Sequence, residues 1–121
     1  MAIKVLVVDD SFLVFKMIKR AIEPLEMEVV GHAENGKIAL DMFEELSPDI
    51  VTLDMTMPIM DGLTTATHLL EKNPEAKIIF LSSIGDEDLL ENARKIGIKH
   101  FIQKPINTEE LVSAIDSLMS E

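Results

Sequence analysis

The chain has 121 residues and no cysteine, and its 22 acidic residues outnumber its 11 lysines and arginines, giving a formal net charge of −11. This length fits one domain, residues 1–121. A domain of this size buries roughly two-thirds of its unfolded surface on folding and needs no disulfide or metal to hold its core. The lack of cysteine excludes disulfides and thiolate metal sites. The excess of acids repels a phosphate backbone, so we expect no direct nucleic-acid partner.

The chain shows no sequence pattern of membrane insertion or secretion. The first ten residues hold one lysine and run into two acids, which is not the pattern of a signal peptide. No apolar stretch approaches the roughly 20 residues that a membrane-spanning helix needs. We therefore expect a cytoplasmic protein without membrane insertion.

The first apolar run, residues 3–8, predicts a buried strand that ends in Asp9 and Asp10. Apolar residues then recur at helical spacing over residues 12–25, which predicts a helix. Asp10 or Ser11 is positioned to cap the start of this helix.

The start of that helix carries more apolar side chains than one buried face requires. Phe12, Leu13 and Phe15 are the additional ones. They are either extra core residues or an exposed docking surface near Asp54.

The rest of the chain repeats the same alternation of apolar runs and helical patterns. The further strands are predicted at residues 27–30, 50–53, 78–81 and 101–103. The helices that follow them are predicted at residues 36–46, 63–72, 87–96 and 107–119. Asn35, Asp86 and Asn107 are the expected N-caps, and residues 31–36 are expected to form a turn.

Five alternations of strand and helix predict an α/β fold with a doubly wound parallel sheet and helices on both faces. In such an open sheet, ligands bind beyond the carboxyl ends of the strands. The polar residues expected at that edge are Asp9, Asp10, Asp54, Ser82 and Lys104.

Several carboxylates at one edge of a sheet predict a metal site. Asp9, Asp10 and Asp54 would repel one another unless a cation neutralises them, and oxygen ligands favour Mg²⁺, with Mn²⁺ as an alternative. Beside such a cation, Asp54 can attack phosphorus and form an acyl phosphate. Lys104 and Ser82 are suited to hold the phosphate oxygens.

Each of these residues also has a simpler explanation. An aspartate after a strand is commonly a cap or a turn residue, Lys104 alone is a solvated lysine, and Ser82 alone is a turn hydroxyl. Their joint occurrence at four strand ends favours a site for phosphoryl transfer.

The motifs, taken together, resemble the receiver domain of bacterial two-component response regulators, and the resemblance covers essentially the whole chain. They are Asp9-Asp10, Asp54-x-x-Met57-Pro58-x-Met60-Asp61-Gly62, Ser82 and Lys104-Pro105. The resemblance implies a stand-alone regulator, similar to those of chemotaxis, with a flavodoxin-like sheet of order 2-1-3-4-5. It also suggests a cis peptide bond before Pro105.

By this resemblance, Asp54 is the phosphoacceptor for a sensor histidine kinase, a phosphotransfer protein or a small donor such as acetyl phosphate. Asp10 and Asp54 would bind Mg²⁺ directly, and the backbone carbonyl of Thr56 would be a third protein ligand. Asp9 would act largely through water.

The resemblance also assigns the phosphate contacts and the switch. Ser82 and Lys104 would hold phosphate oxygens, helped by the backbone N–H groups of Met55 and Ser83. Phe101 would be the switch aromatic, which turns inward as the Ser82 hydroxyl moves toward the phosphate. The alternative for Phe101 is a permanent place in the core.

Phosphorylation would then alter the surface of the fourth helix, fifth strand and fifth helix, where a downstream protein target binds. The chain would be a monomer, or a dimer on phosphorylation. In the family, the side chains at the positions of Thr56 and Ile84 affect the hydrolytic water. Ile84 cannot hydrogen-bond that water, so we expect slower self-dephosphorylation than with glutamate at this position.

Two other functions compete with a phosphorylation switch that is not a turnover enzyme. An Mg²⁺-dependent phosphohydrolase with an aspartyl-phosphate intermediate would usually need a general acid two residues past its nucleophile, where this chain has Thr56. A flavodoxin-like cofactor binder is disfavoured because acids would line its phosphate end. The sequence leaves open whether the pathway is chemotaxis or a phosphorelay.

Overall fold

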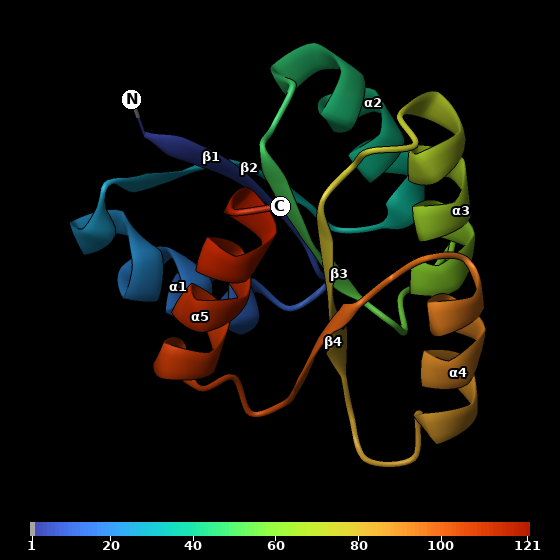
Figure 1. Ribbon diagram of the computed structural model, residues 1–121. Coiled ribbons are helices and arrows are strands. Elements are labelled where there is room, and N and C mark those ends of the chain that lie inside the picture. The colour runs from blue at the N-terminus through green and yellow to red at the C-terminus, as the bar shows by residue number, and fades with distance from the viewer. Residues whose placement is uncertain (1) are drawn as a thin grey trace.

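In the computed structural model, which describes residues 2–121, five parallel strands form one sheet with helices on both sides (Figure 1). The strands are β1 (Ile3–Val8), β2 (Met27–Ala33), β3 (Ile50–Asp54), β4 (Ile78–Ser82) and β5 (His100–Gln103). The helices are α1 (Phe12–Ile22), α2 (Gly36–Leu46), α3 (Gly62–Lys72), α4 (Glu87–Lys95) and α5 (Thr108–Met119), with a 3-10 turn η1 (Glu23–Leu25) after α1. The sheet order β2-β1-β3-β4-β5 confirms the predicted doubly wound, flavodoxin-like fold.

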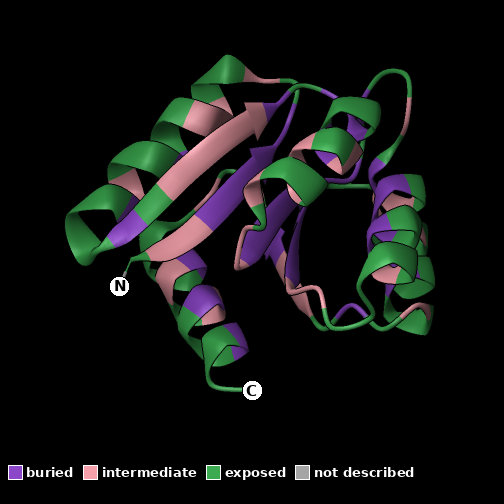
Figure 2. Cartoon of the chain, turned by 90° about the horizontal axis from the view of Figure 1, so that it is seen from above, coloured by how far each residue is buried: buried purple, intermediate pink, exposed green. Residues whose placement is uncertain are grey.

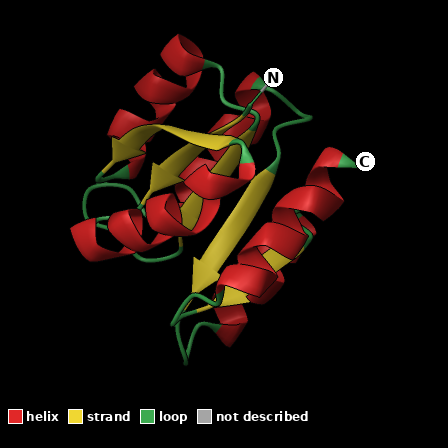
Figure 3. Ribbon diagram, turned by 90° about the vertical axis from the view of Figure 1, so that its left-hand side faces the viewer, coloured by secondary structure: helices red, strands yellow, loops and turns green. Residues whose placement is uncertain are grey.

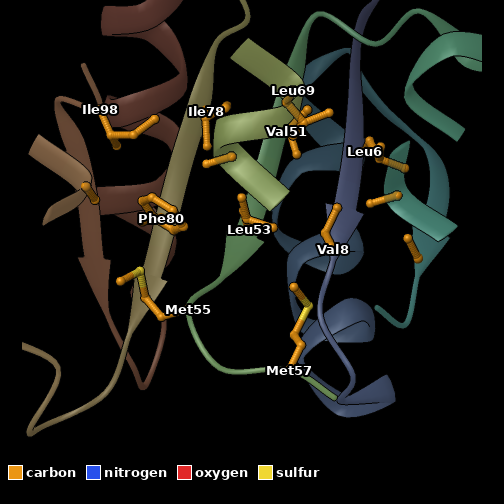
Figure 4. Packing of buried hydrophobic residues seen from close by; sticks show 14 residues of the cluster. Leu6, Val8, Val51, Leu53, Met55, Met57, Leu69, Ile78, Phe80 and Ile98 are labelled. Atoms are coloured by element: carbon orange, nitrogen blue, oxygen red, sulfur yellow. The ribbon is translucent and has the colours of Figure 1, made fainter. Parts of the chain in front are cut away.

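The central strands are buried on both faces, because their successive side chains point to opposite sides of the sheet and helices cover both sides. One core cluster joins Leu6 and Phe80 to α2, α3 and α4 (Figure 4). The other joins Val7 and Ile79 to α1 and α5. Figure 3 shows the two helical layers with the sheet between them, and Figure 2 shows buried residues concentrated in the strands and on the inner helix faces.

The second strand is longer than predicted. The expected turn at residues 31–36 was wrong at its start, because β2 continues to Ala33 and stays paired with β1 after a register shift. Gly31 lies within this strand, where a Cβ atom would approach Leu46 Cδ1 to 2.9 Å. The glycine therefore serves close packing of α2 on the sheet, and does not mark a turn.

The predicted N-caps hold at three of four helices. Ser11, Asn35 and Asn107 each accept a hydrogen bond from a backbone N–H in the first turn of the following helix. Asp86 stands at the start of α4, but its side chain caps nothing there and instead accepts the N–H of Ser83 at 2.7 Å. Ser11 is thus the cap of α1, and the expected capping role of Asp86 was wrong.

The start of α1 does not belong to the core. Phe12 is 61% exposed and Leu13 is 68% exposed, so the core interpretation was wrong for both. Phe15 is half-buried and stacks on His32, with 4.4 Å between the ring centroids.

Across residues 2–121, the helices are too short or too polar to cross a membrane.

Thr52 carries a buried polar atom that weakens the fold. It lies in the middle of β3 between Val7 and Ile79, and its hydroxyl is the one buried side-chain polar atom without a hydrogen bond within residues 2–121. Valine has nearly the same shape without the unpaired hydroxyl. Thr52→Val is therefore expected to raise the free energy of unfolding by about 1 kcal/mol, measured by urea denaturation.

Thr65→Val is the matched control. Thr65 is equally buried, but its hydroxyl donates to the carbonyl oxygen of Asp61 at 2.7 Å, so its loss is expected to destabilise the fold. A destabilised Thr52→Val protein would contradict the prediction.

Candidate functional site

The carboxyl ends of β1 and β3 bring three acids together. β1 and β3 are adjacent and in register, with Val8 beside Leu53, so Asp9 and Asp10 emerge next to Asp54. One carboxylate oxygen from each acid lies within 4.8 Å of the others. Asp9 and Asp54 are buried, whereas Asp10 is exposed to solvent.

Lys104 reaches the same cluster from the loop after β5. Its Nζ lies 3.0 Å from Asp9 Oδ2 and 3.4 Å from Asp54 Oδ1. Its backbone N–H donates to the carbonyl oxygen of Ser82 at 2.7 Å, which ties this loop to the end of β4. The peptide bond between Lys104 and Pro105 is cis, as the resemblance suggested.

The pKa values of Asp54 and Lys104 are both raised. Burial and the neighbouring charge of Asp9 raise the pKa of Asp54 from 3.8 to about 6, although Lys104 acts in the opposite direction. Burial alone would lower the pKa of Lys104, but its hydrogen bond to Asp9 and the charge of Asp54 outweigh that effect and raise it. A single lysine does not balance three carboxylates, so the cluster favours an additional cation.

The donor set suits a hard divalent ion. All three side chains offer carboxylate oxygens, which are the ligands that Mg²⁺ takes in proteins. Asp9 is already engaged, since it accepts from the Ser11 N–H at 2.8 Å and from Lys104. Asp10, exposed at the mouth of the cluster, is free of such partners within residues 2–121. The cluster is thus consistent with a magnesium site.

The loop between β3 and α3 shapes the other side of the site. Gly62 donates its N–H to the carbonyl oxygen of Met55 at 3.0 Å, and a Cβ atom at Gly62 would lie 2.2 Å from the carbonyl oxygen of Asp54. Only glycine permits this approach. Asp61 caps α3 through the N–H of Thr64, so the motif fixes the path of the chain beside the phosphoacceptor candidate.

The backbone donors predicted for phosphate already have acceptors. Met55 N–H donates to the Leu81 carbonyl at 3.1 Å, and Ser83 N–H donates to Asp86. By contrast, Thr56 N–H lies 3.4 Å from Asp54 Oδ1, which makes it a donor that sequence reasoning missed. The one signal for it in the sequence is the turn that follows Asp54.

The predicted switch residues lie on β4 and β5. Ser82 is the buried last residue of β4. Phe101 is half-buried beside Phe80, with 6.2 Å between ring centroids, and the Arg94 guanidinium lies 5.0 Å from the centre of its ring. Phe101 is therefore partly exposed in this conformation, and its switching role stays a prediction.

Residues 5–116 match the response regulator receiver domain family, and the chain belongs to this family. It is 41% identical over 114 residues to the chemotaxis protein CheY of Listeria monocytogenes, covering 94% of this chain and 96% of that protein. It is 38% identical over 120 residues to the chemotaxis protein CheY of Bacillus subtilis, covering 99% and 100%.

Solved structures show the same relationship. A chain in the crystal structure of the CheX-CheY-BeF3-Mg complex from Borrelia burgdorferi matches with a TM-score of 0.91 and 31% identity, covering 98% of this chain and 90% of that chain. The family and these relatives identify the chain as a phosphorylation-activated switch of two-component signalling, and they do not favour the phosphohydrolase.

Asp54→Asn is expected to stabilise the metal-free protein in a pH-dependent manner. Because the pKa of Asp54 is about 6 in the folded chain against 3.8 for an ordinary aspartate, its ionised form destabilises the fold. That destabilisation is complete above about pH 6 and disappears as the pH falls toward about 3.8. In EDTA, urea denaturation should show a gain of about 1–3 kcal/mol at about pH 7.5 and a smaller gain at about pH 4.5.

Asp41→Asn, on the exposed face of α2, serves as the control and should change stability little at either pH. Equal stabilisation by Asp54→Asn at both pH values would show that the Asp54 charge is not the cause.

Proposed function

We propose that this receiver accepts a phosphoryl group on Asp54 from a sensor histidine kinase or a phosphotransfer protein. The position of Asp54 carries the proposal, because this buried carboxylate lies beside Asp9 and Lys104 at the ligand-binding edge of the sheet. The ammonium group 3.4 Å from its oxygen is suited to the negative charge of an incoming phosphoryl group.

The proposed reaction is an in-line displacement at phosphorus. A carboxylate oxygen of Asp54 bonds to phosphorus, the P–N bond of the donor phosphohistidine breaks, and the released imidazole nitrogen takes up a proton. Lys104 and the Ser82 hydroxyl hold the transferred oxygens, with backbone N–H groups of Met55 and Ser83 as further donors once their present bonds open. The Thr56 N–H, already directed at Asp54, is an additional donor.

We propose Mg²⁺ as the cofactor, with Mn²⁺ as a substitute. Asp10, Asp54 and the Thr56 carbonyl would hold the ion directly, and Asp9 would act largely through water. The hydrogen bonds that the Asp9 carboxylate accepts from the Ser11 N–H and from Lys104 support this indirect role. When bound, the ion neutralises the carboxylates and the phosphoryl oxygens.

The proposed output is a change of partner binding, with residues 1–121 acting as one receiver domain. Ser82 moves toward the phosphoryl group, Phe101 turns inward, and the surface of α4, β5 and α5 changes for a downstream protein. The chain would catalyse its own phosphorylation and slow dephosphorylation without turnover. It would act in the cytoplasm, as a monomer or as a dimer on phosphorylation. Its relatives are chemotaxis proteins, which favours a chemotaxis pathway over another phosphorelay.

Beryllofluoride, a mimic of the phosphoryl group, tests this function. With Mg²⁺ it is expected to bind one-to-one and to shift amide resonances of α4, β5 and α5, and acetyl phosphate should add one phosphoryl group per chain by intact mass. Asp54→Asn should abolish all of these effects, whereas the exposed control Asp41→Asn should retain them. Rapid multiple turnover of phosphate esters would instead support a hydrolase, and failure to bind Mg²⁺ or beryllofluoride would contradict both functions.

Ile84→Glu is expected to shorten the lifetime of the phosphoryl group. Ile84 lies two residues past Ser82 and is 85% exposed, so a glutamate there meets solvent at the mouth of the site and can orient a water. The half-life of the phosphoryl group is measured by release of labelled phosphate. Ile59→Glu is the control, because it places an acid at another exposed position, on the loop between β3 and α3. An unchanged or longer half-life in Ile84→Glu would refute the assignment.

A further inference from the structure

The loop between β4 and α4 holds another acid, Asp86, next to Ser83, whose N–H is a predicted phosphate donor. Ser83 follows the buried Ser82, and its N–H donates to Asp86 Oδ2 at 2.7 Å. The Asp86 N–H returns a bond to the Ser83 carbonyl at 3.2 Å, and Gly85, at φ +101°, allows the chain to close between them. A carboxylate therefore occupies a backbone donor at the edge of the site.

Asp86 makes this bond in preference to another one that its position offers. It stands immediately before α4, where an aspartate side chain ordinarily accepts an N–H from the first helical turn. Asp61 does so before α3, where its Oδ1 accepts the Thr64 N–H at 2.8 Å. Since the Asp86 side chain makes no such bond, the Ser83 N–H is the stronger competitor for its carboxylate.

The charge around the loop sharpens this competition. Glu87 and Asp88 follow Asp86 in the first turn of α4, and the carboxylates of the Asp54 cluster lie at the same edge of the sheet. A phosphoryl group on Asp54 carries nearly two negative charges, in place of the single charge of the carboxylate. Its oxygens are strong acceptors for the Ser83 N–H, and they repel the carboxylate that holds it.

We propose that Asp86 is an internal competitor of the phosphoryl group for the Ser83 N–H. In the unphosphorylated chain its carboxylate occupies this donor, and phosphorylation of Asp54 displaces the carboxylate into solvent. The inference rests on the proposed function, specifically on the Ser83 N–H as a phosphate donor. Asp86 is a positioning residue that acts through Ser83, and it lowers the affinity of the site for phosphoryl groups.

The competition predicts a second response to phosphorylation, in addition to the inward turn of Phe101. Displacement of the Asp86 carboxylate removes one of the two hydrogen bonds that close the turn before α4 and leaves only the backbone bond from the Asp86 N–H to the Ser83 carbonyl. The start of α4 is thus loosened by the same oxygens that recruit Ser82.

Titration with beryllofluoride and Mg²⁺ tests the competition. Asp86→Ala frees the Ser83 N–H and is expected to lower the Kd by roughly three- to tenfold, the effect of one hydrogen bond. Asp86→Asn keeps an oxygen acceptor without the charge and should give a smaller decrease. Glu87→Ala is the matched control, because it removes a neighbouring exposed acid that makes no hydrogen bond to Ser83 within residues 2–121.

The amide resonance of Ser83 gives a readout that a general change in charge would not move. In the absence of ligand it is expected to shift in Asp86→Ala and to stay in place in Glu87→Ala. An equal decrease of Kd in Asp86→Ala and Glu87→Ala, or an unshifted Ser83 resonance in Asp86→Ala, would overturn the competition.

The two proposals fail in different ways. If wild type binds beryllofluoride through Asp54 and Asp86→Ala binds with the same Kd, the competition is refuted and the proposed function stands. If wild type binds no better than Asp54→Asn, the proposed function is refuted and the competition falls with it.

Discussion

The close approach of Asp54 to Asp9 and Lys104 is the interaction on which the site depends. It exists because β1 and β3 are neighbours in the sheet, while Lys104 is tied to the end of β4 through the Ser82 carbonyl. The arrangement is electrostatically unfavourable on its own, as the raised pKa of Asp54 shows. Two apolar clusters, one on each face of the sheet, hold it in place. The fold thus holds together three carboxylates whose concentrated negative charge suits a divalent cation.

The sequence predicted the position of these groups because parallel topology leaves little choice. Once strand and helix alternate, the strands share a direction, and the residues after them meet at one edge. Asp9, Asp10, Asp54 and Lys104 could therefore be grouped without knowledge of any contact. Sequence reasoning failed where a residue's usual local role was overridden, as at Gly31, which packs against α2 within a strand although glycine commonly marks a turn.

The finer geometry of the site depends on which acceptor lies nearest to each donor, and no local pattern specifies that. Asp86 has the sequence context of an N-cap, yet its carboxylate accepts the N–H of Ser83, just after β4, instead of an N–H in the first turn of α4. The Met55 N–H was assigned to phosphate, but the ladder between β3 and β4 extends far enough to engage it with Leu81. The backbone donor directed at the Asp54 carboxylate is instead the N–H of Thr56. These outcomes follow from three-dimensional competition between bonds of similar strength.

The helices beside the site differ in how firmly the core holds them. Figure 1 places α3 and α4 on the same side of the sheet. α3 buries four residues, Gly62, Thr65, Ala66 and Leu69, whereas α4 buries only Ala93. Elements with few buried contacts open at the lowest free-energy cost. A change at the edge of the sheet should therefore move α4 more readily than α3, and α4 also contacts the half-buried Phe101 through Arg94. On the proposed function, weak anchoring of one helix, rather than flexibility of the whole fold, would direct the response to the surface of α4 and β5.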